Sequence, residues 1–181
     1  MGILELFGWG GDRKEQAPSP SAADTETVRK ISLALDRLEP GRARYIAAFA
    51  YLLSRVAAAD LTISEEESRE MERIVEDKGG IPEAQAVMVV QMAKTQNVLF
   101  GGVENFLVTR EFEKIATREQ KLALLHCLFA VSAADRSISS AEDTTIRMIA
   151  SELRLEHADF IGVRLAYVDR LATRGANPRS S

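Results

Sequence analysis

The stretch AAADLTIS at residues 57–64 returns as SAADRSIS at residues 132–139, and this repetition organises the chain. Aligning Asp60 with Asp135 makes five of the eight positions identical, and the same offset pairs Glu67 with Glu142. We call residues 57–64 the first joint and residues 132–139 the second joint. Each joint separates an apolar helical stretch from a charged one. The sequence therefore predicts two pseudo-symmetric helix-joint-helix repeats.

Outward from the joints, apolar residues recur at the i, i+3, i+4 spacing of a helix face, and no segment alternates with the period of a strand. Pro40-Gly41 is expected to end the first helix, and Gly79-Gly80 to end the third. We predict an all-α, single-domain bundle of seven to eight short helices. The expected helical segments cover about residues 24–38, 42–58, 64–78, 82–93, 103–115, 117–133, 139–153 and 156–171.

The composition divides the 181 residues into a helical domain with two tails. Residues 1–24 combine an apolar start with a linker rich in Gly, Pro and Ser, and residues 173–181 are expected to be a disordered tail. The domain is expected over residues 25–172. Residues 3–9 lack the features of a signal peptide, and they are expected either to be disordered or to dock on the domain, on a partner or at a membrane surface.

The charge and cysteine content limit the classes of function. A formal net charge of −4 and the lack of a basic cluster argue against nucleic-acid binding. The single cysteine, Cys127, fits a reducing compartment, so we expect a cytoplasmic protein, in one alternative peripheral at the inner membrane. His126 and His157 lack the spacing of a zinc site, and the adjacent helical residues His126 and Cys127 point in different directions, which argues against a Cys-His nucleophile.

The acidic residues of the joints have two interpretations. Ser64 with Glu67, and Ser139 with Glu142, have the spacing of a capping box. Asp60 and Asp135 can accept hydrogen bonds in a local turn, or they can bind a divalent cation. The first joint offers further oxygen donors at Thr62, Ser64, Glu66 and Glu67. An EF-hand is excluded because, counting from Asp60, position six is Glu65 and position twelve is Met71.

The twice-repeated Ala-Ala-Asp…Ile-Ser…Glu pattern resembles the tellurite-resistance TerB-like family, including its free-standing bacterial branch, over about residues 45–171. The resemblance implies an all-α fold, a bacterial protein and an acidic surface that binds divalent metal. The family's acidic positions correspond to Asp60, Glu66 and Glu67 in the first unit and to Asp135 and Glu142 in the second.

The chain departs from the family pattern after each aspartate. Leu61 and Arg136 stand where the family has glycine, and Ala141 replaces the acid that matches Glu66. The Arg136 cation beside Asp135 can take the place of a metal. If a divalent metal is bound, whether calcium, magnesium or zinc, it is therefore expected at the first joint rather than the second.

These features predict a non-catalytic module that mediates protein interactions, with a divalent metal as one interpretation of its acidic residues. The resemblance implies that the module serves a bacterial stress or envelope-related process. Residues 60–77 hold eight acids against Arg69 and Arg73, which form either a solvated face or a docking surface for a basic partner. Two alternatives stay open. One is a metal-dependent enzyme using the carboxylates of Asp60 and Glu67, and the other is a peripheral membrane adaptor using residues 3–9.

Overall fold

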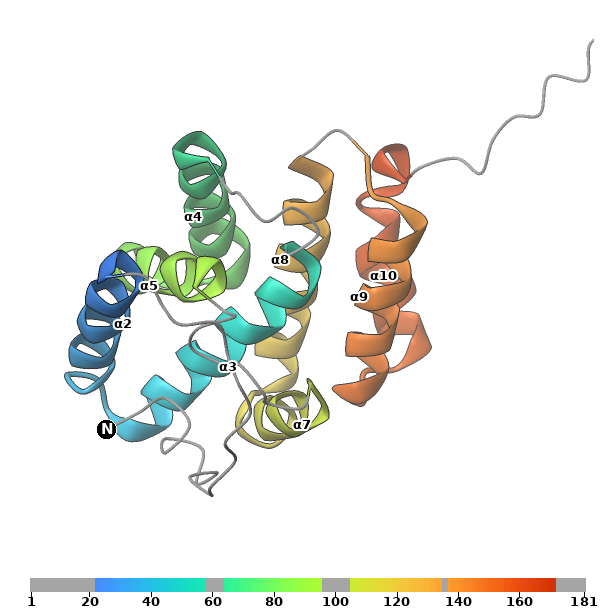
Figure 1. Ribbon diagram of the computed structural model, residues 1–181. Helices are drawn as coiled ribbons and strands as arrows, with labels where there is room; N and C mark the ends of the chain where they lie inside the picture. Colours follow the sequence, from blue (N-terminus) through green and yellow to red (C-terminus); the bar gives the residue numbers. More distant parts are fainter. Residues whose placement is uncertain (1–21, 58–63, 96–104, 135–136, 172–181) are drawn as a thin grey trace, which may run out of the picture.

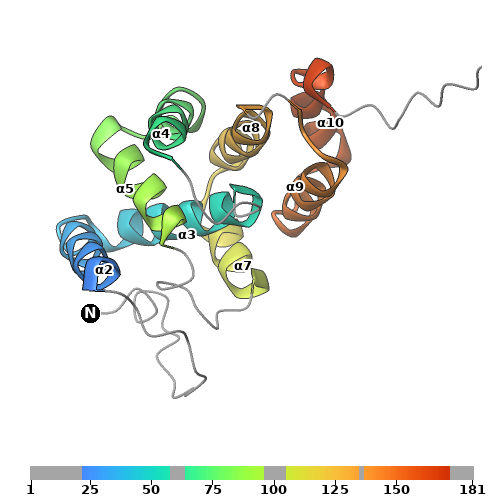
Figure 2. The same ribbon diagram turned by 45° about the horizontal axis from the view of Figure 1, so that its top comes forward.

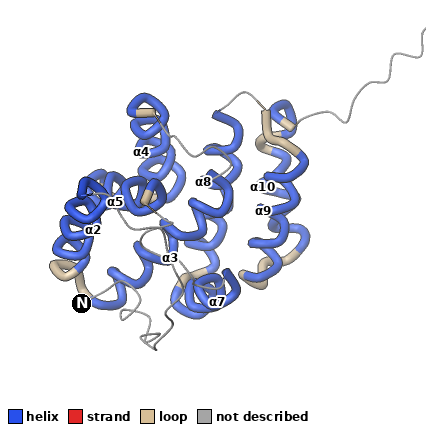
Figure 3. Tube along the Cα trace, viewed as in Figure 1, coloured by secondary structure: helices blue, strands red, loops and turns tan. Residues whose placement is uncertain are grey.

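The structure, a computed structural model, describes residues 22–57, 64–95, 105–134 and 137–171. These residues form eight α-helices and one 3-10 turn, and Figures 1 and 3 show no strand among them. The predicted all-α bundle is confirmed. The elements are α2 (Ala22–Leu35), α3 (Pro40–Ala57), α4 (Glu65–Gly79), α5 (Glu83–Lys94), α7 (Asn105–Ile115), α8 (Arg118–Ala134), α9 (Ser140–Glu152), α10 (His157–Leu165) and η1 (Val168–Arg170).

Helix α3 lies at the centre of the fold. Twelve of its 18 residues are buried, on all sides of the helix, as is typical of a helix surrounded by others. It contacts α5, α7, α8 and α9, and Figure 2 shows it crossing between α4 and α5 on one side and α7 on the other. Residues 46–50 include three alanines, which let the neighbouring helices approach closely.

Aromatic side chains fill the space between α3 and α7. Phe112 is fully buried, with its ring stacked on Tyr45 at a centroid distance of 5.3 Å and edge-on to Phe49 at 6.2 Å. A second group lies between α8 and the C-terminal elements, where Phe129 stacks on Tyr167 at 5.5 Å and contacts Phe160. These two groups fix α7 and the C-terminal helices against the two apolar helices α3 and α8.

In each of the two helix-joint-helix units, the helix after the joint contacts the helix that precedes the other joint. Helix α4, which follows the first joint, lies mainly against α8 and α5, whereas α9, which follows the second joint, contacts α3, α7 and α8. The approach of α4 to α8 is close at Gly79, where an added Cβ would lie 3.2 Å from both Cys127 Sγ and Phe49 Cζ. Reciprocal packing is compatible with a pseudo-twofold relation. Superposition of residues 51–75 on 126–150 remains its test.

Two helix boundaries differ from the prediction. Helix α2 begins at Ala22, before the expected cap at Asp24 or Thr25, because Ala22 and Ala23 are strong helix formers. It ends at Leu35, and Pro40 and Gly41 open α3 instead of only ending α2, since proline fits the first turn of a helix. The Glu39 carboxylate accepts a hydrogen bond from the Arg42 N–H at 3.0 Å, as a helix cap does.

Candidate functional site

The first joint leads into α4 through a capping box. The Ser64 hydroxyl accepts a hydrogen bond from the Glu67 N–H at 3.1 Å, and Glu67 Oε2 accepts one from the Ser64 N–H at 2.6 Å. These bonds lower the pKa of the Glu67 carboxyl, because hydrogen bonds from Ser64 stabilise its charged form. The predicted cap is confirmed, and one carboxylate oxygen of Glu67 is engaged in it.

The second joint has the same cap and an additional closure. Ser139 and Glu142 form a reciprocal capping box, with the Ser139 N–H 2.7 Å from Glu142 Oε2. The buried Ile138 donates its N–H to the Arg170 carbonyl at 2.7 Å and forms an isolated bridge with Leu171. The residues that follow α10 therefore hold the entry to α9 in place.

The predicted metal residues divide into three groups. Asp60 and Asp135 lie outside the described residues, so their convergence with the glutamates stays a prediction. Glu67 and Glu142 each use an oxygen in a cap. Glu66 is exposed, and its side chain has no hydrogen bond or ion pair within the described ranges. In those ranges, no three carboxylate, imidazole or thiol groups gather in a way that could hold a metal ion.

A lysine lies beside the first joint. The Ser68 hydroxyl donates to the Ser64 carbonyl at 2.7 Å and accepts from Lys94 Nζ at 2.9 Å. This contact ties the end of α5 to the start of α4, and it places a positive charge one turn from the glutamates of α4. This contact could not be predicted from the sequence, because Lys94 and Ser68 are 26 residues apart.

The formal charge of the protein is concentrated on α4. Seven acidic and three basic side chains give this helix a net charge of −4, which equals that of the whole chain. The outward side chains are solvated, with Glu65 92% and Glu70 51% exposed. The basic residues Arg69 and Arg73 form loose ion pairs within the helix, at 3.9 and 3.5 Å. The outer side of α4, which we call the acidic face, is therefore a compact negatively charged surface.

The side chains of Cys127 and His126 are packed in the core or against it. Cys127 faces α4, with Sγ 3.6 Å from the Ile74 carbonyl, and burial raises its pKa to about 12. His126 faces the C-terminal turn instead, where the Tyr167 hydroxyl donates to its backbone carbonyl at 3.0 Å. Burial lowers the pKa of His126. The two side chains have different surroundings, as the sequence predicted.

Two features were not predicted from the sequence. Arg55, whose side chain is 9% exposed, forms a two-point ion pair with Glu152 at 2.6 and 3.3 Å and donates to Thr109 Oγ1 at 3.0 Å. This pair, together with the hydrogen bond to Thr109, joins α3, α7 and α9. The only sign of it in the sequence was Arg55 itself, a single arginine within the apolar run of α3.

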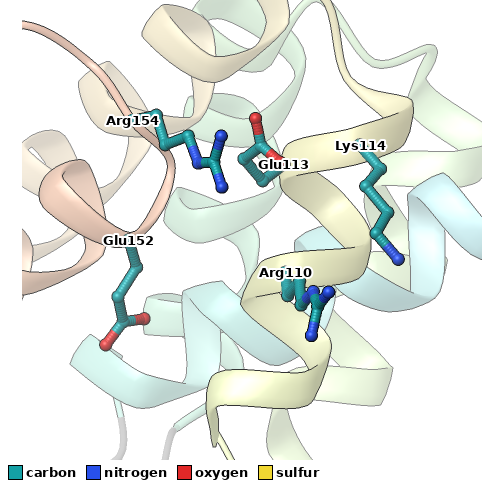
Figure 4. Close-up of a pocket in the computed structure, with 5 residues that line it drawn as sticks. All are labelled: Arg110, Glu113, Lys114, Glu152 and Arg154. Atoms are coloured by element: carbon teal, nitrogen blue, oxygen red, sulfur yellow. The ribbon is translucent and has the colours of Figure 1, made fainter.

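A pocket of about 230 Å³ lies near this pair, between α7 and the end of α9 (Figure 4). The pocket is lined by Arg110, Glu113, Lys114, Glu152 and Arg154.

The comparisons with known proteins agree with this architecture. No curated protein and no solved structure matches the chain. The family model described as tellurite resistance protein TerB matches residues 46–165, about two thirds of the chain. This region runs from α3 to the end of α10 and contains both joints. The chain belongs to the TerB family.

Proposed function

We propose that this protein is a non-catalytic TerB-like module that binds a basic protein partner through the acidic face of α4. The concentration of charge on α4 carries the proposal. A solvated negative surface attracts a positive partner over several ångströms and so speeds and orients their encounter. The name of the family connects the module with tellurite resistance, and a bacterial stress or envelope-related process is the setting that we propose for it.

The position of α4 in the fold suits this role. Its inner face is held by Met71, Val75 and Gly79, which are buried against the bundle, so the outer side chains can change without loss of packing. Arg69 and Arg73 neutralise only part of the negative charge. Ion pairs at such exposure contribute little to stability, which leaves the carboxylates available to a partner.

Charge reversal on α4 should abolish partner binding. The variant carries Glu70→Lys and Asp77→Lys, two exposed positions on the outer side. The control variant carries Asp36→Lys and Asp169→Lys, which change the net charge equally at exposed sites outside α4. In affinity capture from the native cell with quantitative mass spectrometry, we expect basic proteins that the wild type and the control retain and the α4 variant loses. Capture should weaken as salt is added. The same proteins retained by all three would refute the docking face.

We also propose that a divalent metal binds at the first joint. The described donors fit calcium or magnesium, which prefer oxygen ligands: Glu66 has a free carboxylate, and one oxygen of Glu67 is outside the cap. At the second joint, Ala141 replaces the match to Glu66. The capping bonds keep Glu67 ionised, which favours a cation, whereas Lys94 opposes it.

Calorimetric titration with calcium, magnesium and zinc tests the asymmetry. We expect binding to the wild type that is lost in Asp60→Asn, weakened in Glu66→Gln and retained in Asp135→Asn. The last variant is the matched control, because it makes the same change at the repeated position. The titrations extend to about millimolar metal, a range that includes weak calcium sites. If none of the three metals gives a heat of binding, the metal proposal is wrong, and the repeated aspartate is explained as an acceptor of hydrogen bonds in a local turn.

A further inference from the structure

Helix α7 lies on the far side of α3 from α4 (Figures 1 and 2), and the pocket lies between α7 and the end of α9. Arg110, Glu113 and Lys114 come from neighbouring turns of α7, whereas Glu152 and Arg154 come from the end of α9 and the turn after it. Figure 4 shows the Arg154 guanidinium extending toward α7. Two elements that are distant in the sequence thus bring charged groups to one cavity.

Both glutamates of the pocket form ion pairs with basic side chains that do not line it. Glu152 is held at two points by Arg55, and Glu113 lies 3.3 Å from Lys121 in a pair whose side chains are 22% and 13% exposed. In contrast, Arg110 and Arg154 have no ion pair or side-chain hydrogen bond within the described part of the chain. Lys114 has only a distant carboxylate, Glu111, at 4.0 Å. The pocket therefore has an excess of positive charge in a protein whose net charge is −4.

The backbone at Arg154 is the second sign of a site. Its φ of 57° is the left-handed conformation, and among the described residues it is the only non-glycine with positive φ. The Leu155 N–H bonds the Ala150 carbonyl and the Arg154 N–H bonds the Ser151 carbonyl, which is a Schellman motif with arginine where glycine is usual. A side chain in this conformation costs stability, and such outliers cluster at functional sites.

We propose that this pocket binds a dianionic phosphate monoester through the guanidinium groups of Arg110 and Arg154, with Lys114 supplying a third positive charge. Guanidinium groups offer paired donors that match phosphate oxygens. The pocket, at about 230 Å³, is smaller than the ~300–1,000 Å³ of drug-sized ligand sites. It fits the phosphate group with a small substituent. From the turn after α9, the Arg154 side chain extends toward α7 (Figure 4).

Binding is measured by titrating isotope-labelled protein with glycerol 1-phosphate and following backbone and arginine signals by NMR. We expect saturable shifts confined to α7 and the turn after α9. Arg110→Gln and Arg154→Gln should each weaken binding about tenfold, the effect of one charge-assisted hydrogen bond. Arg37→Gln is the matched control, because it removes the same charge from an exposed site elsewhere and should leave the affinity unchanged.

The variant Arg154→Gly separates the effect of the backbone conformation from the effect of the side-chain charge. Glycine adopts the left-handed conformation without strain, so this variant should fold at least as well as the wild type and still bind about tenfold more weakly. Vesicles of phosphatidylcholine, with and without phosphatidic acid, distinguish a lipid headgroup from a free phosphate ester as the source of the ligand. Unchanged affinity in both pocket variants, shifts elsewhere on the molecule, or equal binding of succinate would overturn the proposal.

Discussion

Replacing Glu152 with alanine is expected to lower the free energy of unfolding by about 3 kcal/mol, the lower end of the range for breaking a buried ion pair, because 25% of the Glu152 side chain is exposed. The change leaves the Arg55 guanidinium, 9% exposed, without its two-point partner. Thr109, which is fully buried, accepts from one nitrogen of Arg55 but cannot balance the charge. The loss therefore reflects an unpaired charge held away from water rather than the strength of the pair itself. Chemical denaturation measures it.

Two further variants isolate this cause. Arg55→Met with Glu152→Met removes both charges and should cost less than Glu152→Ala alone, because no unpaired charge remains. Glu65→Ala breaks an exposed pair on α4 and should change stability by less than about 0.5 kcal/mol. If Glu152→Ala and Glu65→Ala had similar effects, the Arg55–Glu152 pair would not be the link between α3, α7 and α9 that its geometry indicates.

Phe112→Ala should lower the free energy of unfolding by about 4 kcal/mol, because it removes a fully buried ring and leaves a cavity. The ring contacts Tyr45 and Phe49 of α3, so its loss also removes two aromatic contacts. Urea denaturation is the measurement. The slope of the transition should be unchanged if both states keep their compactness.

The loss of stability should depend on how much of the Phe112 side chain is removed. Phe112→Leu retains most of the apolar volume and should cost considerably less than the alanine variant. Leu33→Ala serves as the exposed control, since Leu33 is 51% exposed on α2 and its loss should change little. A cost for Phe112→Ala no greater than that for Leu33→Ala would mean that α7 is not packed on α3 as the structure places it.

The features that could be predicted from the sequence depend on neighbouring residues. The capping boxes at Ser64 and Ser139 need only a partner three residues away, and the glycine at 80 takes the left-handed cap at φ 61°. The helical class follows from periodicity over each segment. These signals are local, so their interpretation did not require knowledge of the tertiary fold.

The features that could not be predicted join distant segments. Arg55 and Glu152 are 97 residues apart, and nothing near either residue indicates the other. The left-handed turn at Arg154 lacks the glycine that usually marks it. Of the candidate metal residues, Glu67 and Glu142 could be assigned to caps because caps are local, whereas coordination by Asp60 depends on how the first joint is folded.

The packing of α4 on α8 has a consequence for synthesis of the chain. The ribosome releases α4 before α8 exists, so the apolar stripe with Met71 and Val75 first has only α5 and the earlier helices to cover it. Contacts between segments so far apart form late, because a long loop must close first. A nascent chain that ends before α8 therefore exposes an apolar surface on its most charged helix. We expect the surrounding negative charges to keep such chains apart and to limit their aggregation before the domain is complete.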